Sequence, residues 1–144
     1  MKIKKAQTKN LREIGIIMKE VFSKPPFNEK SSLSSILKSL HFYYKKDKIY
    51  FAQENKEIIG VVIFGIEEWW EDAVLIIQDL VVKNKYQNKG IGRYLMKFVE
   101  AYAREHKVKR IYFQTHKKSR GVYFYKKLGY KINKNRISLS KKLK

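Results

Sequence analysis

The stretch Gln87-Asn88-Lys89-Gly90-Ile91-Gly92 decides the fold, because it separates two segments with different periodicities. Upstream, residues 73–82 form a run of branched apolar residues that is typical of a largely buried strand. Downstream, apolar residues recur at the spacing of an amphipathic helix: Ile91, Tyr94, Leu95, Phe98, Val99 and Tyr102. The sequence therefore predicts a glycine-containing turn where a strand ends and a helix begins.

Such a turn suits a pyrophosphate. The first backbone N–H groups of a helix have no partner within the helix, and the helix dipole makes that end positive. Gly90 and Gly92 have no Cβ to hold an anion away from those groups. A P-loop is excluded because Lys89 precedes Gly90 and Ile91 follows it. A dinucleotide fingerprint is excluded because Leu95 stands where its third glycine belongs.

The remaining pattern, Gln-x-x-Gly-x-Gly after a Leu-x-Val strand, resembles the acetyl-CoA loop of the GNAT superfamily of N-acyltransferases. A second segment, Tyr125-Lys126-Lys127-Leu128-Gly129-Tyr130, resembles the family's Tyr-x-Lys-Leu-Gly-Phe, with Tyr130 replacing Phe. The resemblance implies acetyl-CoA as co-substrate and acetyl transfer to a primary amine by direct attack. The acceptor would be a small molecule, a lysine or a protein N-terminus. The implied cofactor-binding residues are Leu80, Val81, Val82, Gln87, Asn88, Lys89, Gly90, Ile91, Gly92 and Arg93.

The resemblance also implies a general acid. Tyr125 corresponds to the family's tyrosine that protonates the leaving thiolate, and a phenol with a pKa of about 10 stays protonated at neutral pH. The alternative is that Tyr125 only packs within the aromatic cluster around it. Two departures from the family pattern lie nearby, since Lys118 replaces an asparagine and Gly121 an alanine. They leave the cofactor contacts of that helix open.

The general base is not fixed by the resemblance. Relatives carry a glutamate at one of two strand positions, which are Ile76 and Gln114 here. Neither side chain takes up a proton. Asp79 and His116 are therefore the candidate catalytic bases, with Glu68 or a water chain as alternatives.

The order of periodic segments predicts the architecture. We expect a strand within 1–6, helices over 10–22 and from Ser31 or Ser32, and a hairpin of 49–53 with 58–66. After the helix that follows Gly90 we expect a strand at 110–115, a helix at 119–128 and a last hairpin of 130–134 with 136–140. Strand, helix, strand implies a parallel pair with a right-handed crossover. The resemblance implies an α/β fold with a mostly antiparallel sheet, one parallel βαβ crossover and helices on both faces. The length predicts a single domain over residues 1–144.

The charge is concentrated in one half of the chain. Of the net +20, residues 83–144 contribute +18, from 20 basic and two acidic residues. Such a surface attracts a polyanionic cofactor, and equally RNA, DNA or an anionic membrane. The second hypothesis is therefore a basic nucleic-acid- or ribosome-associated CoA-binding module without catalysis. A lysine-rich proteome is a third explanation of the same charge.

The residue composition excludes several kinds of site. The absence of cysteine excludes disulfides and thiolate metal sites and permits a reducing compartment. We expect a cytoplasmic protein without a metal centre, and no stretch is apolar enough to span a membrane. Trp69 and Trp70 lie in an acidic turn, residues 67–72. That turn predicts either one wall of a site for a cationic amine acceptor or a contact within a homodimer.

Overall fold

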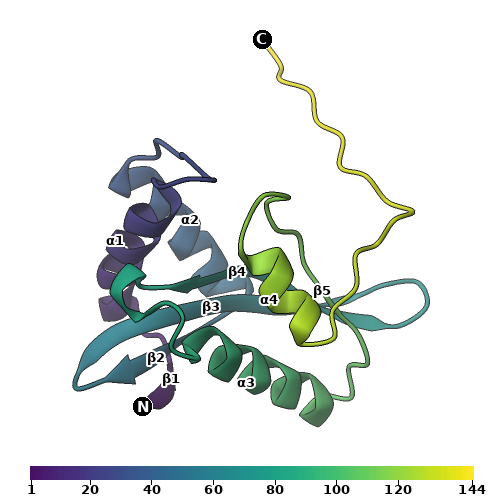
Figure 1. The fold of residues 1–144 in the computed structure, drawn as a ribbon, viewed down its shortest axis with the longest axis horizontal. Helices are drawn as coiled ribbons and strands as arrows, with labels where there is room; N and C mark the ends of the chain where they lie inside the picture. The colour runs from purple at the N-terminus through teal and green to yellow at the C-terminus, as the bar shows by residue number, and fades with distance from the viewer. The chain divides into compact units, whose positions relative to one another are not determined.

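The computed structural model describes residues 1–144 as two compact units, Met1–Gln114 and Thr115–Lys144. The first unit holds a five-stranded sheet with the order β1-β2-β3-β4-β5 (Figure 1). Its strands are β1 (Lys2–Lys5), β2 (Lys48–Glu54), β3 (Glu57–Glu68), β4 (Ala73–Val82) and β5 (Ile111–Tyr112). Its helices are η1 (Thr8–Asn10), α1 (Leu11–Phe22), α2 (Leu33–Lys46), η2 (Asn84–Tyr86) and α3 (Ile91–Glu105). The second unit contains α4 (Gly121–Lys127).

The sheet topology confirms the predicted α/β fold. Strands β1 to β4 pair antiparallel in chain order, while β4 and β5 pair parallel. Helix α3 lies between those two strands in the sequence and forms the crossover. The β3–β4 ladder contains a bulge: Ile63 pairs with Asp79 and Phe64 with Ile77, so Gln78 is an extra residue on β4.

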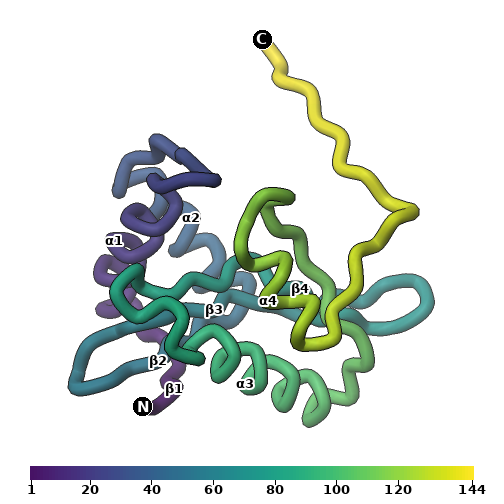
Figure 2. The backbone as a smooth tube through the Cα atoms, in the orientation of Figure 1, coloured from purple at the N-terminus to yellow at the C-terminus, as the bar shows by residue number.

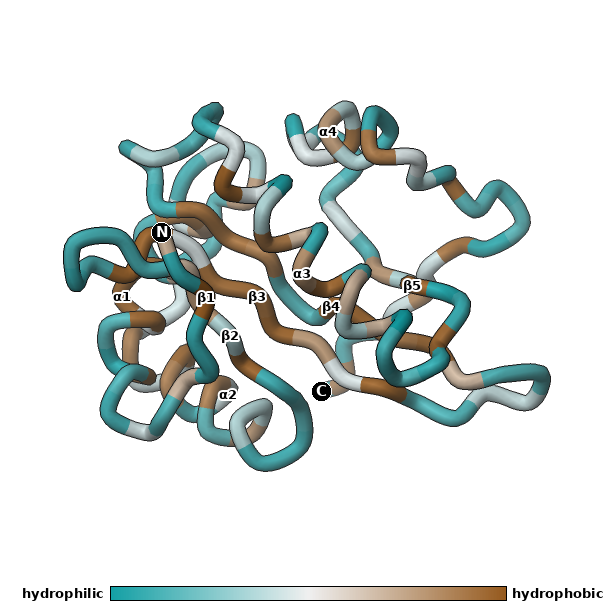
Figure 3. Tube along the Cα trace, turned by 90° about the horizontal axis from the view of Figure 1, so that it is seen from below, coloured by the Kyte–Doolittle hydropathy of each residue, from teal (hydrophilic) through white to brown (hydrophobic).

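Helices cover both faces of the sheet. On one face, Ile14 and Leu40 from α1 and α2 pack with Val61, Ile63 and Val81 of β3 and β4. On the other face α3 lies close to the sheet, and a Cβ added at Gly60 would come within 3.0 Å of Ile91 and Leu95. Covered on both sides, β3 is buried without interruption from residue 58 to residue 64. Figure 3 shows the resulting hydrophobic track along β3 and β4.

Two local predictions about turns and caps are confirmed. Ser32 is the N-cap of α2, and its hydroxyl accepts a hydrogen bond from Ser35 N–H. The β2–β3 hairpin closes through Asn55 and Lys56, which have φ of 50° and 65°. Two successive left-handed residues are typical of the tight turn that matches the twist of paired strands.

The predicted last hairpin is wrong in this structure. Residues 130–140 form no strand, and the chain only turns at Lys134 and Asn135. Strand β5 is also shorter than the predicted 110–115. Apolar alternation alone suggested these strands, but a strand needs a hydrogen-bonded partner. The two predicted strands carry lysine or arginine and no acid, so pairing them would oppose like charges.

The structure contains no helix with both the length and the apolar character that a membrane crossing requires.

A buried carboxyl depends on a glycine of β3, Gly65, which lies just past the end of the β2–β3 ladder. Asp47 follows α2, and its side chain is 7% exposed. One of its oxygens, Oδ2, is buried without a hydrogen-bond partner, and burial raises the pKa of this carboxyl. The other oxygen occupies the space where a Cβ on Gly65 would lie. The packing of Asp47 therefore requires glycine at position 65.

Gly65→Ala should therefore lower the free energy of unfolding by about 1–3 kcal/mol, the usual range for overpacking a filled site. The measurement is chemical denaturation of the single variant and of Asp47→Ala/Gly65→Ala. Removing the Asp47 carboxyl frees the space, so the alanine should cost much less in the double variant. An equal loss in both backgrounds would show that Asp47 does not set the requirement.

Candidate functional site

The turn between β4 and α3 leaves donors free at the start of the helix. Gly90 is the N-cap with φ +84°, and no side chain caps the helix. The first intrahelical bond runs from Tyr94 N–H to the Gly90 carbonyl, at 3.0 Å. The N–H groups of Ile91, Gly92 and Arg93 precede it and have no carbonyl to bind within the helix. The first turn has no acidic residue, so this positive helix end is not neutralised.

The backbone before the helix forms a concave nest. Asn88 has φ +62° and Gly90 has φ +84°, so left-handed residues lie on both sides of Lys89. Successive N–H groups in such a turn converge on a concavity that suits an anion. A Cβ on Gly90 would meet no protein atom within 4 Å. Packing therefore does not demand glycine there, whereas its left-handed φ and close approach by a ligand do.

The edge of β4 next to this nest has no strand partner. Pairing with β5 ends at Ile76. On the other side, Lys83 N–H donates to the Ile59 carbonyl, which sets the alternation of the ladder with β3. By that alternation the backbone groups of Leu80 and Val82 face away from β3. An extended ligand with amide groups can bind such an edge as an added strand does.

Gln87 joins the edge to the nest. Its Nε2 donates to the Val82 carbonyl at 3.0 Å and to Asn84 Oδ1 at 3.2 Å. The Val82 carbonyl is the last outward-facing group of β4, so this side chain fixes the position at which the strand ends. The sequence predicted Gln87 as a cofactor contact, and the structure gives it a positioning role within the loop.

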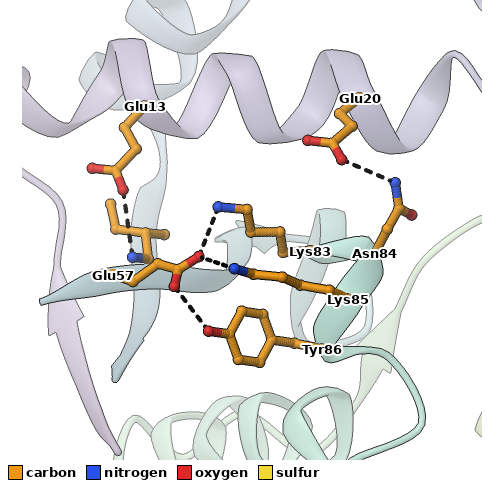
Figure 4. A network of polar contacts seen from close by, with 8 residues as sticks. Glu13, Glu20, Glu57, Lys83, Asn84, Lys85 and Tyr86 are labelled. Carbon is orange, nitrogen blue, oxygen red and sulfur yellow. Dashed lines mark hydrogen bonds and ion pairs between the residues drawn. The ribbon is translucent and has the colours of Figure 1, made fainter. Parts of the chain in front are cut away.

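A polar network anchors the connection between β4 and α3 (Figure 4). Glu57 accepts hydrogen bonds from Lys83 Nζ and from the Tyr86 hydroxyl, both at 2.8 Å, and Lys85 Nζ lies at 3.4 Å. The bond from Lys83, followed by that from Tyr86, lowers the pKa of Glu57 to about 2. Asn84 also donates to Glu20 of α1 at 3.4 Å. No sequence motif links Glu57 to a loop 26 residues later, so sequence analysis missed this network.

Glu57→Gln should weaken both the fold and its acid dependence. Because the pKa of Glu57 is lower in the folded chain than its usual 4.5, its stabilisation is present above pH 4.5. It is lost as the pH falls toward about 2. The variant should melt at a lower temperature than the wild type at pH 7, and the difference should shrink below pH 4. A constant difference across that range would contradict the role of the carboxylate.

Asp79 is the ionisable residue of β4, and it directly precedes Leu80 at the unpaired part of the strand. It is partly buried, and by strand alternation its side chain shares a face with Val81, which packs against α1 and α2. Burial raises the pKa of this carboxyl from 3.8 to about 7, and the Glu29 carboxylate adds to the shift. A carboxyl with that pKa accepts and releases protons near neutral pH.

The second unit contains the aromatic segment around Tyr125. The Tyr125 ring lies 5.0 Å from the Phe124 ring and 6.1 Å from the Tyr130 ring, measured between centroids. The Tyr125 carbonyl accepts hydrogen bonds from the N–H groups of Leu128 and Tyr130 at the end of α4. The predicted aromatic cluster is therefore present, with Tyr125 partly buried in it.

His116 belongs to a turn of the same unit. Its Nδ1 accepts a hydrogen bond from Lys118 N–H at 3.1 Å, and its carbonyl accepts one from Ser119 N–H at 2.9 Å. The first unit thus brings together Asp79, the β4 edge and the whole glycine loop, whereas the two other catalytic candidates, Tyr125 and His116, belong to the second unit.

Comparison with known protein families gives a match over most of the chain. Residues 16–130 match the model of the Acetyltransferase (GNAT) family. Among curated proteins, the chain is 30% identical over 86 residues to Probable N-acetyltransferase 14 of Danio rerio, covering 59% of this chain and 30% of that protein. It is 36% identical over 58 residues to N-alpha-acetyltransferase 80 of Mus musculus, covering 40% of this chain and 18% of that protein. Each alignment spans less than a third of the relative.

Solved structures share the fold at low identity. A possible acetyltransferase from Clostridium difficile 630 has a TM-score of 0.86 at 15% identity, with 99% of this chain and 98% of that chain covered. An aminoglycoside 6'-N-acetyltransferase from Acinetobacter haemolyticus has a TM-score of 0.81 at 16% identity, with 100% of both chains covered. At this identity the likeness shows the fold alone.

Proposed function

Because the chain belongs to the GNAT family of acetyltransferases, we propose that it transfers an acetyl group from acetyl-CoA to a primary amine by direct attack. The observation that supports this most is the uncapped start of α3 beside an unpaired strand edge. A pyrophosphate and a chain of amides are the two features that this pair of sites fits, and the pantetheine–pyrophosphate part of acetyl-CoA contains both.

The residues that would hold the cofactor follow from this arrangement. The N–H groups of Ile91, Gly92 and Arg93 would bind pyrophosphate oxygens, with Lys89 and Arg93 adding positive charge. The outward-facing backbone groups of Leu80 and the N–H of Val82 would bind the pantetheine amides, since Gln87 already donates to the Val82 carbonyl. Val81, between them, would hold the strand in place through its buried side chain. Gln87 and Asn88 would shape the loop.

Acetyl transfer needs a neutral amine, a stabilised oxyanion and a protonated leaving group. Asp79 would accept the proton that the acceptor amine loses. The amine nitrogen would form the new bond to the carbonyl carbon, and a backbone N–H of β4 would stabilise the oxyanion. The carbon–sulfur bond would then break, and Tyr125 would give its phenolic proton to the thiolate. Holding both substrates together would supply much of the rate.

The acceptor class is the finer part of the proposal. Asp79 and Glu29 place two carboxyl groups near the β4 edge, and their electrostatic coupling favours a cationic acceptor. A lysine, a protein N-terminus and a polyamine-like small molecule all meet that requirement. A panel of amines, peptides and basic proteins, followed by release of free CoA thiol, distinguishes among them.

The charge of residues 83–144 favours one other candidate, a basic CoA-binding module on an anionic partner such as RNA or a ribosome. The two proposals differ in what they expect from the same protein. The module binds RNA with a steep salt dependence and acetylates no member of the amine panel. The enzyme turns over acetyl-CoA with at least one amine.

The cofactor loop is tested by Gly90→Asp against Gly90→Asn. Both residues adopt the left-handed φ at similar cost, and only aspartate places a negative charge where the pyrophosphate would lie. Gly90→Asp should lower acetyl-CoA affinity at least tenfold, about 1.4 kcal/mol, and Gly90→Asn much less. Calorimetric titration gives the affinities, and the rise in melting temperature with saturating acetyl-CoA gives a second readout. If a folded Gly90→Asp variant binds acetyl-CoA with wild-type affinity, the loop only connects β4 to α3 and does not bind the cofactor.

A further inference from the structure

A chain of aromatic rings leads from the core of the first unit to its surface at the end of α3. The ring of Phe64, which is buried, lies 4.9 Å from the Tyr102 ring, measured between centroids. Tyr102 is half-buried and stacks on the exposed His106, with centroids 4.0 Å apart and planes at 15°. The Tyr50 ring of β2 lies 6.4 Å from that of Tyr102. Because one face of the His106 ring lies on Tyr102, its opposite face is available to a further ring.

The His106 ring is held in one orientation. Its Nδ1–H donates to the Tyr102 carbonyl at 2.9 Å, and the same carbonyl accepts from the His106 backbone N–H at 3.1 Å. The helix closes directly after it, since Val108 is buried and its N–H donates to the Ala103 carbonyl at 2.8 Å. This is the bond pattern of a Schellman motif. A ring that is already fixed loses little conformational freedom when a ligand stacks on it.

Three lysines belong to the same part of the first unit. Lys48 pairs with Phe64 in the β2–β3 ladder, and directly opposed residues share a face of the sheet. Lys5 pairs with Tyr50 in the β1–β2 ladder in the same way, so both lysines lie on the face that α3 covers. Lys107 directly follows the histidine and has φ of 58°, at a position of the helix end where glycine is usual. None of the three takes part in an ion pair.

We propose that single-stranded RNA binds here, with one base stacked on His106 and the neighbouring phosphates beside the three lysines. An aromatic platform with cations along the path of the backbone is how proteins hold unpaired nucleotides. RNA is favoured over DNA because its loops and ends present unpaired bases that stack on side chains such as histidine. An acidic protein or an anionic membrane would account for the lysines but not for the exposed, fixed ring. The stacking surface comprises Lys5, Lys48, Tyr102, His106 and Lys107, all in the first unit.

The stacking surface is separate from the proposed cofactor site. Helix α3 has 15 residues, so at 1.5 Å per residue its two ends lie about 20 Å apart. Figure 2 shows α3 starting at the loop that follows β4 and ending away from that loop. RNA and acetyl-CoA can therefore bind at the same time. We expect RNA binding with or without acetyl-CoA, and whether or not the chain transfers acetyl groups.

The test compares two single strands of equal charge. The full-length chain is titrated without acetyl-CoA, over a series of salt concentrations, with a fluorescent single-stranded RNA and with the same ribose–phosphate strand lacking bases. The RNA should bind about tenfold more tightly than the abasic strand, a size typical of one base–aromatic stack. Equal affinities would overturn the proposal, because they would show attraction to charge alone. Tighter binding to single-stranded DNA, anionic vesicles or polyglutamate would overturn it too.

Variants at His106 test the platform itself. His106→Ala should lower the affinity for RNA about tenfold, to that of the abasic strand, and leave the abasic affinity unchanged. His106→Tyr keeps a ring at this position and should retain the preference for RNA. If the alanine variant melts like the wild type and still prefers RNA to the abasic strand, the proposal is wrong. It is also wrong if a folded tyrosine variant loses that preference.

Adjacent lysines of β1 provide a matched control for the charge. Lys4 pairs with Phe51, which packs in the core on the α1 and α2 face, so Lys4 lies on the opposite face from Lys5. Lys5→Gln should weaken binding of RNA and of the abasic strand alike and flatten the salt dependence. Lys4→Gln should change neither. Lys107→Gly removes a charge where glycine suits the backbone, so it should weaken binding without lowering the melting temperature. Equal losses from Lys4→Gln and Lys5→Gln would overturn the placement of RNA on this face.

Discussion

Tyr125→Phe should lower kcat at least about a hundredfold, the loss typical of a missing general acid. The substitution removes one hydroxyl and little volume, so the ring contacts with Phe124 and Tyr130 should persist. Affinity for acetyl-CoA should stay close to wild type, because the phenol would act on charge that develops only as the carbon–sulfur bond breaks. Steady-state assays with a saturating amine, together with calorimetric titration of the cofactor, measure both quantities.

The chain offers a matched control two residues away. Tyr123 lies on the same helix but is 67% exposed, and Lys127 Nζ lies 4.6 Å from its ring centroid. Tyr123→Phe should therefore leave kcat unchanged. If Tyr125→Phe keeps wild-type turnover under conditions where chemistry limits the rate, then Tyr125 only packs in its aromatic cluster. Equal losses in the two variants would indicate a general effect on α4 rather than proton transfer.

The parts of the site that were predicted from sequence depend on local chemistry. Gly90 and its neighbours predict a strand-to-helix turn, because the glycines, the apolar strand before them and the helical spacing after them lie in one continuous stretch of sequence. The buried run of β3 and the two-residue turn at Asn55 and Lys56 have the same origin. A local sequence pattern does not show which strand a given strand pairs with. For that reason the last hairpin was predicted from the alternation of residues 136–140 and is not formed.

The missed features all join residues that are distant in sequence. Glu57 meets Lys83 and Tyr86 only because β3 and β4 are neighbours in the sheet. Asp47 fills the space over Gly65 only because β2 and β3 pair in one register. The bulge at Gln78 belongs to the same class. Asp79 is intermediate, since its sequence position made it a candidate while its shifted pKa depends on burial and on Glu29 in the loop between α1 and α2.

Asp79→Asn should lower kcat/KM at pH 8 by about a hundredfold or more if Asp79 is the general base. In the wild type, the ascending limb of the pH profile should have its midpoint near pH 7, where burial and the Glu29 carboxylate hold the pKa of Asp79. That limb should disappear in the variant. Glu29→Gln removes one cause of the shift, lowers the pKa of Asp79 and should move the limb to lower pH with activity retained. A variant with the wild-type profile would assign the base to His116 or to water.

Stability supplies a readout with the opposite sign. The folded chain holds a proton on Asp79 up to about pH 7, whereas the unfolded chain releases it near 3.8. The free energy of unfolding therefore falls as pH rises through that window, and asparagine, which does not titrate, escapes the loss. The difference in free energy of unfolding between Asp79→Asn and the wild type should therefore favour the variant more at pH 8 than at pH 4. If Asp79→Asn loses activity and gains stability at pH 8, then the fold keeps Asp79 in an environment that costs stability and serves catalysis. One that loses both would instead point to damage in the packing of β4.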